Sequence, residues 1–273
     1  GSVSFTEEKR KAIIKYMLDK IRSSDSGFLR KTADNFDISE TSVRRYVKSC
    51  IEEGILLEDQ DSVCGFCLTE SRGQWDLENS GLEEDSVYFE KIAPMLTDIS
   101  ANAGDIWYYA FTEIMNNAIE HSQGDRILLE IRKDPLYTEI SITDNGAGIF
   151  RRIREYMDKK YGIRTDTKQA ALELYKGKLT TEPEAHSGEG IFFVSKMLSE
   201  FAIWSENTAY TYRCTQGDAF IQSHLISYYT RIKEIGTMAV MKLDNDIKHT
   251  SKEIFDQFAP LEQGFVKTLI PVR

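Results

Sequence analysis

Residues 112–122, TEIMNNAIEHS, carry polar side chains at a spacing that suits chemistry. Glu113, Asn117 and His121 are four residues apart, and a four-residue step returns to the same face of a helix. An acid, an amide and an imidazole make a poor core face and an unusual solvent face. The neighbouring amide, Asn116, lies about 100° around the helix and is expected to face elsewhere. The chemical role of this row of side chains can be inferred only together with two glycine motifs later in the chain.

The first glycine motif, TDNGAGI, follows two expected strands that are joined at residues 133–135. The second strand ends at Asp144, and Gly146 and Gly148 come directly after it. A carboxylate at a strand end can accept a hydrogen bond, and the glycines let the backbone approach a flat ligand. Taken alone, the segment is better explained as a turn, because Asn-Gly is among the commonest hairpin signals.

The second glycine motif lies in HSGEGIFFVSKML, where a glycine-rich loop is expected to lead into an apolar helix from Ile191. Backbone N–H groups of Gly188, Glu189 and Gly190, together with the positive end of the helix dipole, would favour a phosphate. The motif is weak evidence by itself, and the P-loop pattern GxxxxGK[ST] does not occur in the chain.

The order of the three motifs resembles the Bergerat-fold ATPases of the GHKL family, which includes gyrases, chaperones, histidine kinases and mismatch-repair proteins. In family terms, the motifs match the N box, the G1 box and the G2 box. The N box, with N-A-x-x-H, is most similar to that of histidine kinases and anti-sigma-factor kinases. The resemblance covers roughly residues 86 to 245. It implies a two-layer α/β sandwich with helices on one face of a mostly antiparallel sheet.

The resemblance also implies roles for single residues, with ATP and Mg²⁺ as cofactors. Asp144 would accept from the adenine amine, Asn117 would ligate Mg²⁺ through its amide oxygen, and Glu113 would orient or deprotonate an attacking water or hydroxyl. His121 is better explained as a structural residue near the helix end. Further nucleotide contacts are expected from Gly146 and Gly148 beside the base, and from Gly188, Glu189, Gly190 and Ile191 beside the phosphates.

Between the G1 and G2 boxes, residues 150–186 correspond to the family's ATP lid. Lys176, Lys178 and Thr181 are candidates for approaching a phosphate when the lid closes. For each of them, an exposed lid residue without such a role is the simpler interpretation.

The N-terminal residues 3–68 are expected to form three helices and a hairpin, which resembles a winged helix-turn-helix. The net charge is −10 for the chain, but residues 5–57 carry eleven Lys/Arg and nine Asp/Glu, a balance of +2. The proposed recognition helix contains Arg44, Arg45 and Lys48, which suit DNA. A wing that docks a protein partner explains the pattern almost as well.

The expected organisation is therefore an α+β chain with a winged helix-turn-helix at residues 3–68 and an ATPase domain at 86–246. Residues 69–85 are polar and acidic and are expected to form a linker. Residues 247–273 are expected to form a C-terminal extension, a helix and the start of another strand, where a further domain would begin.

The favoured function is a bacterial ATP-binding signalling or transcriptional regulator, in which Mg-ATP binding or slow hydrolysis controls the winged helix. A first alternative is an anti-sigma-type protein serine kinase, and a second is a non-enzymatic DNA-binding regulator. None of the four histidines is followed by the acid and proline of a phospho-accepting histidine, which argues against an autophosphorylating kinase.

A cytoplasmic location is expected, for three reasons. The chain has no apolar run of about 20 residues and no signal peptide. Its four cysteines include only one CxxC pair and suit a reducing compartment better than a zinc or redox site. The oligomeric state is not indicated by any pattern in the sequence.

Overall fold

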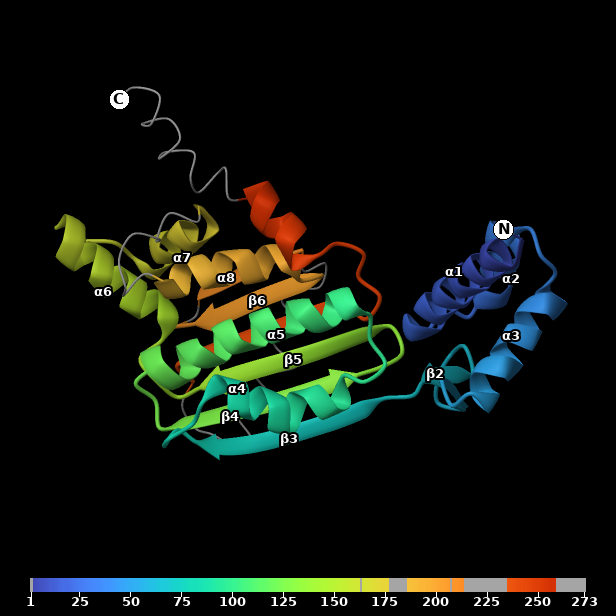
Figure 1. Cartoon of the computed structure of the whole chain (residues 1–273), viewed down its shortest axis with the longest axis horizontal. Helices are drawn as coiled ribbons and strands as arrows, with labels where there is room; N and C mark the ends of the chain where they lie inside the picture. Colours follow the sequence, from blue (N-terminus) through green and yellow to red (C-terminus); the bar gives the residue numbers. More distant parts are fainter. Residues whose placement is uncertain (1, 163, 177–185, 207, 214–234, 259–273) are drawn as a thin grey trace, which may run out of the picture. The chain divides into compact units, whose positions relative to one another are not determined.

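The computed structural model describes residues 2–162, 164–176, 186–206, 208–213 and 235–258 (Figure 1). The chain divides into two compact units. Unit 1 contains Gly1–Ser71 together with Lys133–Tyr137, and unit 2 contains Arg72–Arg132 together with Thr138–Arg273. Unit 1 therefore includes the turn between two strands whose remaining residues belong to unit 2. No helix of the described residues is both long and apolar enough to cross a membrane.

Unit 1 has the expected order of three helices followed by a hairpin. Its elements are α1 (Ser2–Arg22), α2 (Phe28–Phe36), α3 (Glu40–Glu52), β1 (Leu56–Glu58) and β2 (Phe66–Leu68). The strands β1 and β2 pair antiparallel. Helix α3 begins after Ser39, whose hydroxyl oxygen accepts a hydrogen bond from the backbone N–H of Ser42 at 3.1 Å and so caps the helix.

The core of unit 1 forms because each helix has an apolar stripe. Met17 and Ile21 on α1 and Val43 and Val47 on α3 are buried, and they pack in one cluster with Phe28 of α2. The turn residues of the same unit join this cluster through Leu136, while Arg22 makes an ion pair with Asp134 at 2.8 Å.

Unit 2 is built around one six-stranded sheet, in the order β3-β4-β5-β8-β6-β7. Its strands are β3 (Ser71–Glu78), β4 (Arg126–Lys133), β5 (Tyr137–Asp144), β6 (Glu200–Ser205), β7 (Thr208–Tyr212) and β8 (Thr237–Asp244). Strand β6 pairs antiparallel with both β7 and β8. The two strands that were predicted to meet at residues 133–135 are confirmed as β4 and β5.

Helices α4, α5 and α8 cover one face of this sheet (Figure 1). The helical elements are α4 (Glu84–Val87), the π-helix η1 (Tyr88–Ile92), the 3₁₀-helix η2 (Ala93–Met95), α5 (Ala101–Asn116), the π-helix η3 (Asn117–His121), α6 (Ile149–Tyr161), α7 (Thr167–Lys176) and α8 (His186–Met197). Residues 251–258 are also helical, as predicted, whereas the strand expected after them lies outside the described residues. The α+β class is confirmed.

The core of unit 2 lies between these helices and the sheet. Ile106, Trp107 and Phe111 of α5 are 0% exposed and belong to one cluster with Ile140 and Ile142 of β5. Strand β5 therefore packs against the helix that carries the N-box motif. This packing fixes the position of the strand relative to the helix.

The prediction of a linker at residues 69–85 is wrong for residues 71–78, which form the edge strand β3. Gly73, Trp75 and Leu77 are partly buried, while the residues between them are exposed. This alternation is a strand signal, but the acidic character of the surrounding residues outweighed it in the sequence interpretation. Arg126 of β4 forms an ion pair with Asp76 of β3, which helps to hold the edge strand on the sheet.

Residues 84–95 form three short helical segments, α4, η1 and η2, and not one continuous helix. Pro94 lies in the first turn of η2, where its missing N–H cannot continue an α-helical ladder. The short segments still bury Val87, Tyr88 and Ile92 in the core of unit 2.

We expect Phe111→Ala to lower the free energy of unfolding by about 3–5 kcal/mol, because the ring is fully buried and its loss leaves a cavity. Tyr108→Ala on the same helix is the matched control. Tyr108 is 40% exposed, so its removal should cost on the order of 1 kcal/mol, including the hydrogen bond that it donates to Asp85. Urea titration of each variant measures both values. Equal losses for the two would contradict this description of the core.

Candidate functional site

The helix face that carries Glu113 and Asn117 is formed at the junction of two kinds of helix. Helix α5 ends at Asn116, and the backbone N–H of Asn117 still donates to the carbonyl oxygen of Glu113, one α-helical turn earlier. From Asn117 to His121 the backbone is a π-helix. A π-turn closes with an i→i+5 bond, so the geometry of the last step in the row differs from that of the first. The predicted four-residue row is thus α-helical from Glu113 to Asn117, and His121 follows in π-helical geometry.

The side-chain oxygen of Asn117 lies in the protein interior without a hydrogen-bond partner in the described structure. Burying an unsatisfied oxygen costs about 1–3 kcal/mol, so the position is unfavourable for stability alone. An amide oxygen is a suitable ligand for a hard cation such as Mg²⁺, which keeps several waters and binds phosphate oxygens. The donor chemistry at this position therefore fits the ion.

The neighbouring Asn116 has a buried side-chain oxygen without a partner as well. The two amides differ in position, because Asn117 follows Glu113 by one turn and Asn116 does not. No group of three or more His, Cys, Asp or Glu side chains in the described part of the chain is arranged to hold a metal. A cation near Asn117 would therefore depend on phosphate oxygens and water for its remaining ligands.

Glu113 lies directly against the second glycine motif. A Cβ atom added to Gly190 would overlap the Glu113 carboxylate, so only glycine leaves room for this side chain at its observed place. Gly190 belongs to the first turns of α8, whereas Glu113 belongs to α5, and the two helices pack together. The structure thus brings the N-box acid to the G2 glycine, although 76 residues separate them in the sequence.

The loop expected at residues 187–190 is instead helical, since α8 begins at His186 and not at Ile191. The first N–H groups of a helix have no partner within it, so a helix start can offer donors to a ligand, as the predicted loop would. Ile191 is 1% exposed and belongs to the core, which leaves only its backbone for contact with a ligand. The side chain of Glu189 lies outside the described residues, as do Lys178, Thr181 and the side chain of Lys176.

Asp144 is at the end of β5, as predicted, and is only 5% exposed. One of its oxygens accepts hydrogen bonds from the backbone N–H groups of Gly146 at 2.9 Å and Thr237 at 3.3 Å. Burial raises the pKa of this carboxyl from 3.8 to about 6, and the two N–H donors and the charge of Arg152 oppose the rise. The group is therefore ionised at neutral pH in a largely dry environment.

The first glycine motif packs tightly against the end of the π-helix. The N–H of Ala147 donates to the backbone oxygen of Ser122 at 2.8 Å, and a Cβ on Gly146 would overlap that same oxygen. Gly148 has a φ of +87°, which favours glycine. A Cβ atom added to it would meet the Ser205 hydroxyl. The G1 loop and the C-terminal end of the N box are thus in direct contact.

Two parts of this site were not identified from the sequence. Arg152, which was treated as a lid residue, is close enough to influence Asp144 and His121. Burial lowers the pKa of Arg152 and that of His121, and the charge of Arg152 adds to the effect on the imidazole. Arg152 is four residues after Gly148, so helical spacing could have indicated it. Gly236 packs against Asp144, but no motif surrounds it in the sequence.

The described site residues therefore meet in pairs. Gly190 meets Glu113, the G1 loop meets the end of the N box, and Asp144 is enclosed by the G1 loop and the start of β8. All of them belong to unit 2. Comparison of the sequence with models of known protein families finds no family that matches, and comparison with curated proteins finds no similar protein.

The raised pKa of Asp144 predicts a pH-dependent contribution to stability. Between the unfolded value of 3.8 and the folded value of about 6, the folded protein binds more protons, so stability falls as the pH rises through this window. We expect wild type to lose on the order of 2–3 kcal/mol relative to Asp144→Asn between about pH 4 and about pH 7. Unfolding by urea at several pH values measures this difference. A constant difference across the range would contradict the assignment.

Proposed function

We propose that unit 2 binds an adenosine polyphosphate with Mg²⁺ and that its nucleotide state controls unit 1, as in an ATP-dependent signalling or transcriptional regulator. The main support is the buried side-chain oxygen of Asn117, which has no partner and lies one helical turn after an acid that touches the second glycine motif. A metal ion with its phosphate ligands would relieve this otherwise unfavourable position.

Asp144 supports the choice of an adenine base. A buried carboxylate that is ionised at neutral pH accepts hydrogen bonds strongly, and the exocyclic amine of adenine is a donor. Guanine presents a carbonyl oxygen at the equivalent position, which cannot donate a hydrogen bond and would be repelled by the carboxylate. A site built to accept a hydrogen bond from the ligand discriminates against an analogue that lacks the donor. We therefore expect ATP to bind in preference to GTP.

Phosphate binding is assigned to the start of α8. Its first turn presents N–H groups without helical partners and the positive end of the helix dipole, both of which attract an anion. When bound, Mg²⁺ would neutralise charge on the phosphates. In this proposal Glu113, whose carboxylate lies against Gly190, holds a water or a hydroxyl group for attack and accepts its proton. Slow hydrolysis is the reaction that this acid supports without a second protein.

Control of unit 1 can follow the covalent connections between the two units. Strand β5 begins at Tyr137, which belongs to unit 1, and ends at Asp144, which belongs to unit 2. A change at the nucleotide therefore has a short covalent path through this strand. The activity of unit 1, either DNA binding or protein docking, is the output that this proposal requires.

We expect Asn117→Ala to weaken binding of Mg-ATP by about tenfold or more and to abolish its dependence on Mg²⁺, because the proposed metal ligand is lost. Asn116→Ala removes an equally buried amide one residue away and is the matched control, which should bind like wild type. Calorimetric titration with ATP, with and without Mg²⁺, measures both. Equal effects of the two variants, or no heat with wild type, would overturn the proposal.

A separate prediction concerns Glu113. Glu113→Gln keeps the size of the side chain but cannot accept a proton, so ATP should still bind while release of ADP falls by about a hundredfold. Single-turnover measurement of ADP formation tests this. If radiolabelled phosphate instead appears on a partner protein and requires Glu113, the site transfers phosphate to protein, which would favour the serine-kinase alternative. Unchanged ADP release by the variant would remove Glu113 from the reaction.

A further inference from the structure

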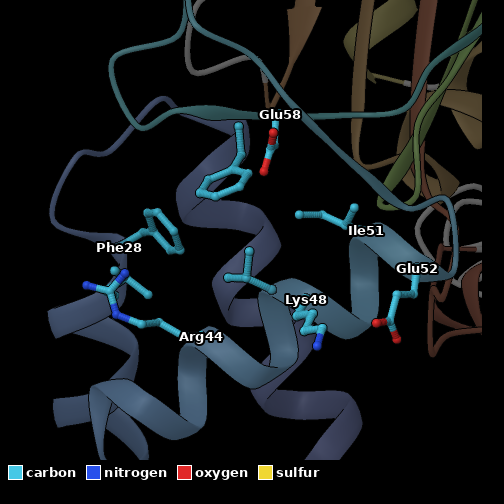
Figure 2. A pocket seen from close by; sticks show the side chains of 9 residues that line it. Phe28, Arg44, Lys48, Ile51, Glu52 and Glu58 are labelled. Carbon is cyan, nitrogen blue, oxygen red and sulfur yellow. The ribbon is translucent and has the colours of Figure 1, made fainter.

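Unit 1 contains an apolar cavity that has no part in the nucleotide site. It has a volume of about 450 Å³ and lies between α2, α3 and the hairpin (Figure 2). Its apolar lining comes from Phe28, Leu29, Val47, Ile51 and Phe66. The rings of Phe28 and Phe66 meet edge to face with centroids 6.0 Å apart, which gives the cavity a firm wall.

Four charged side chains surround this apolar surface, namely Arg44, Lys48 and Glu52 on α3 and Glu58 on β1. Figure 2 shows Glu58 across the cavity from the α3 residues, with Arg44 near Phe28 and Glu52 at the opposite end of the helical row. All four side chains are exposed, and none makes an ion pair or a side-chain hydrogen bond within the described structure. Elsewhere in unit 1, Arg10 and Lys31 do have acidic partners.

The charges are ordered by sign along the cavity. Arg44, Lys48 and Glu52 follow one another at four-residue steps on one face of α3, so Arg44 and Glu52 are about 12 Å apart along the helix axis. Glu52 lies at the end of this row away from Arg44, and Glu58 lies across the cavity from the row (Figure 2). The α3 side of the rim therefore runs from a cation at Arg44 to an acid at Glu52, beside the apolar surface.

This pattern restricts the occupant. Phosphates of a nucleic acid would meet two carboxylates and an apolar floor, which is unfavourable for a polyanion. A free amino acid carries its ammonium and carboxylate groups on the same carbon atom and cannot reach both ends. A peptide segment can place an acidic side chain at Arg44, apolar side chains in the cavity and a basic side chain at Glu52. In helix-in-groove recognition, an amphipathic helix places its apolar anchors in a hydrophobic groove of this kind.

We propose that this cavity is the docking site for an amphipathic segment of a partner protein that has an acidic residue at one end, a basic residue at the other and apolar anchors between them. Two of the three cations that the sequence assigned to DNA, Arg44 and Lys48, then contact protein. The inference does not depend on nucleotide binding, since every lining residue belongs to unit 1.

The test uses three fluorescein-labelled helical peptides with the same apolar anchors. One has an acid and a base about eight residues apart, the second has two acids, and the third has two bases. Fluorescence anisotropy with the full chain should show that the acid–base peptide binds about fivefold to tenfold more tightly than either of the others, whichever direction it takes in the groove.

Single charge reversals should change this preference in opposite directions. Arg44→Glu makes both ends acidic and should favour the two-base peptide, whereas Glu52→Arg makes the α3 row basic and should favour the two-acid peptide. Arg45→Glu is the matched control, because Arg45 is on the same helix but does not line the cavity, and it should keep the wild-type order. Thermal melting establishes that each variant is folded.

Three outcomes would overturn the proposal. The first is that wild type binds none of the peptides, and the second is that it binds all three within about twofold of one another. The third is that duplex DNA competes with the peptides and loses affinity equally on Arg44→Glu and Arg45→Glu, which would assign α3 to nucleic acid. A reversal of peptide order by both cavity variants, with the control unchanged, would establish the site.

Discussion

The structure of unit 2 depends on the burial of one carboxylate at the end of a central strand. Asp144 is almost inaccessible to solvent, and such a group is costly unless backbone donors satisfy it. The N–H groups of Gly146 and Thr237 do so, and they come from the loop after β5 and from the start of β8. The same oxygen therefore fixes the G1 loop and joins it to the neighbouring strand. Replacing a glycine here would move the backbone away from the acid.

This constraint extends to the rest of the candidate site through close contacts at glycines. Gly146 lies against the backbone of Ser122 at the end of the π-helix, and Gly190 lies against the Glu113 carboxylate on α5. Each contact requires the absence of a side chain, so the positions of three distant segments are coupled by packing. The geometry leaves the Asn117 oxygen buried and without a partner next to this arrangement. This unpaired oxygen is the observation on which the proposed ligand role of Asn117 is based.

Much of this arrangement could be predicted from the sequence. Glu113, Asn117 and Asp144 were assigned by residue type, spacing and family resemblance, and the structure places them on the predicted helix and at the predicted strand end. The π-helical geometry of Asn117–His121 was not predictable, because it leaves the pattern of apolar positions nearly unchanged. Gly236 depends on pairing between β5 and β8, a tertiary contact that no local pattern records. The edge strand β3 was missed although its apolar and polar residues alternate, because the surface charge of the segment was given more weight than this two-residue period.

Unit 1 illustrates the opposite case. Its helices and hairpin follow directly from apolar periodicity and the Ser39 cap, whereas the cavity beside α3 depends on how Phe28 and Phe66 meet across two elements. The basic residues of α3 looked like a DNA-contacting row in the sequence, and only the structure places Glu52 and Glu58 around the same apolar surface as Arg44 and Lys48. Charge pattern along a helix therefore does not identify a partner until the neighbouring elements are known.

The most direct measurement of the central claim is a crystal structure of the chain with Mg²⁺ and a non-hydrolysable ATP analogue. The account predicts the metal in contact with the Asn117 side-chain oxygen, the adenine amine on Asp144 and the phosphates at the first turn of α8. A nucleotide bound elsewhere, or bound with the Asn117 oxygen still lacking a ligand, would contradict it.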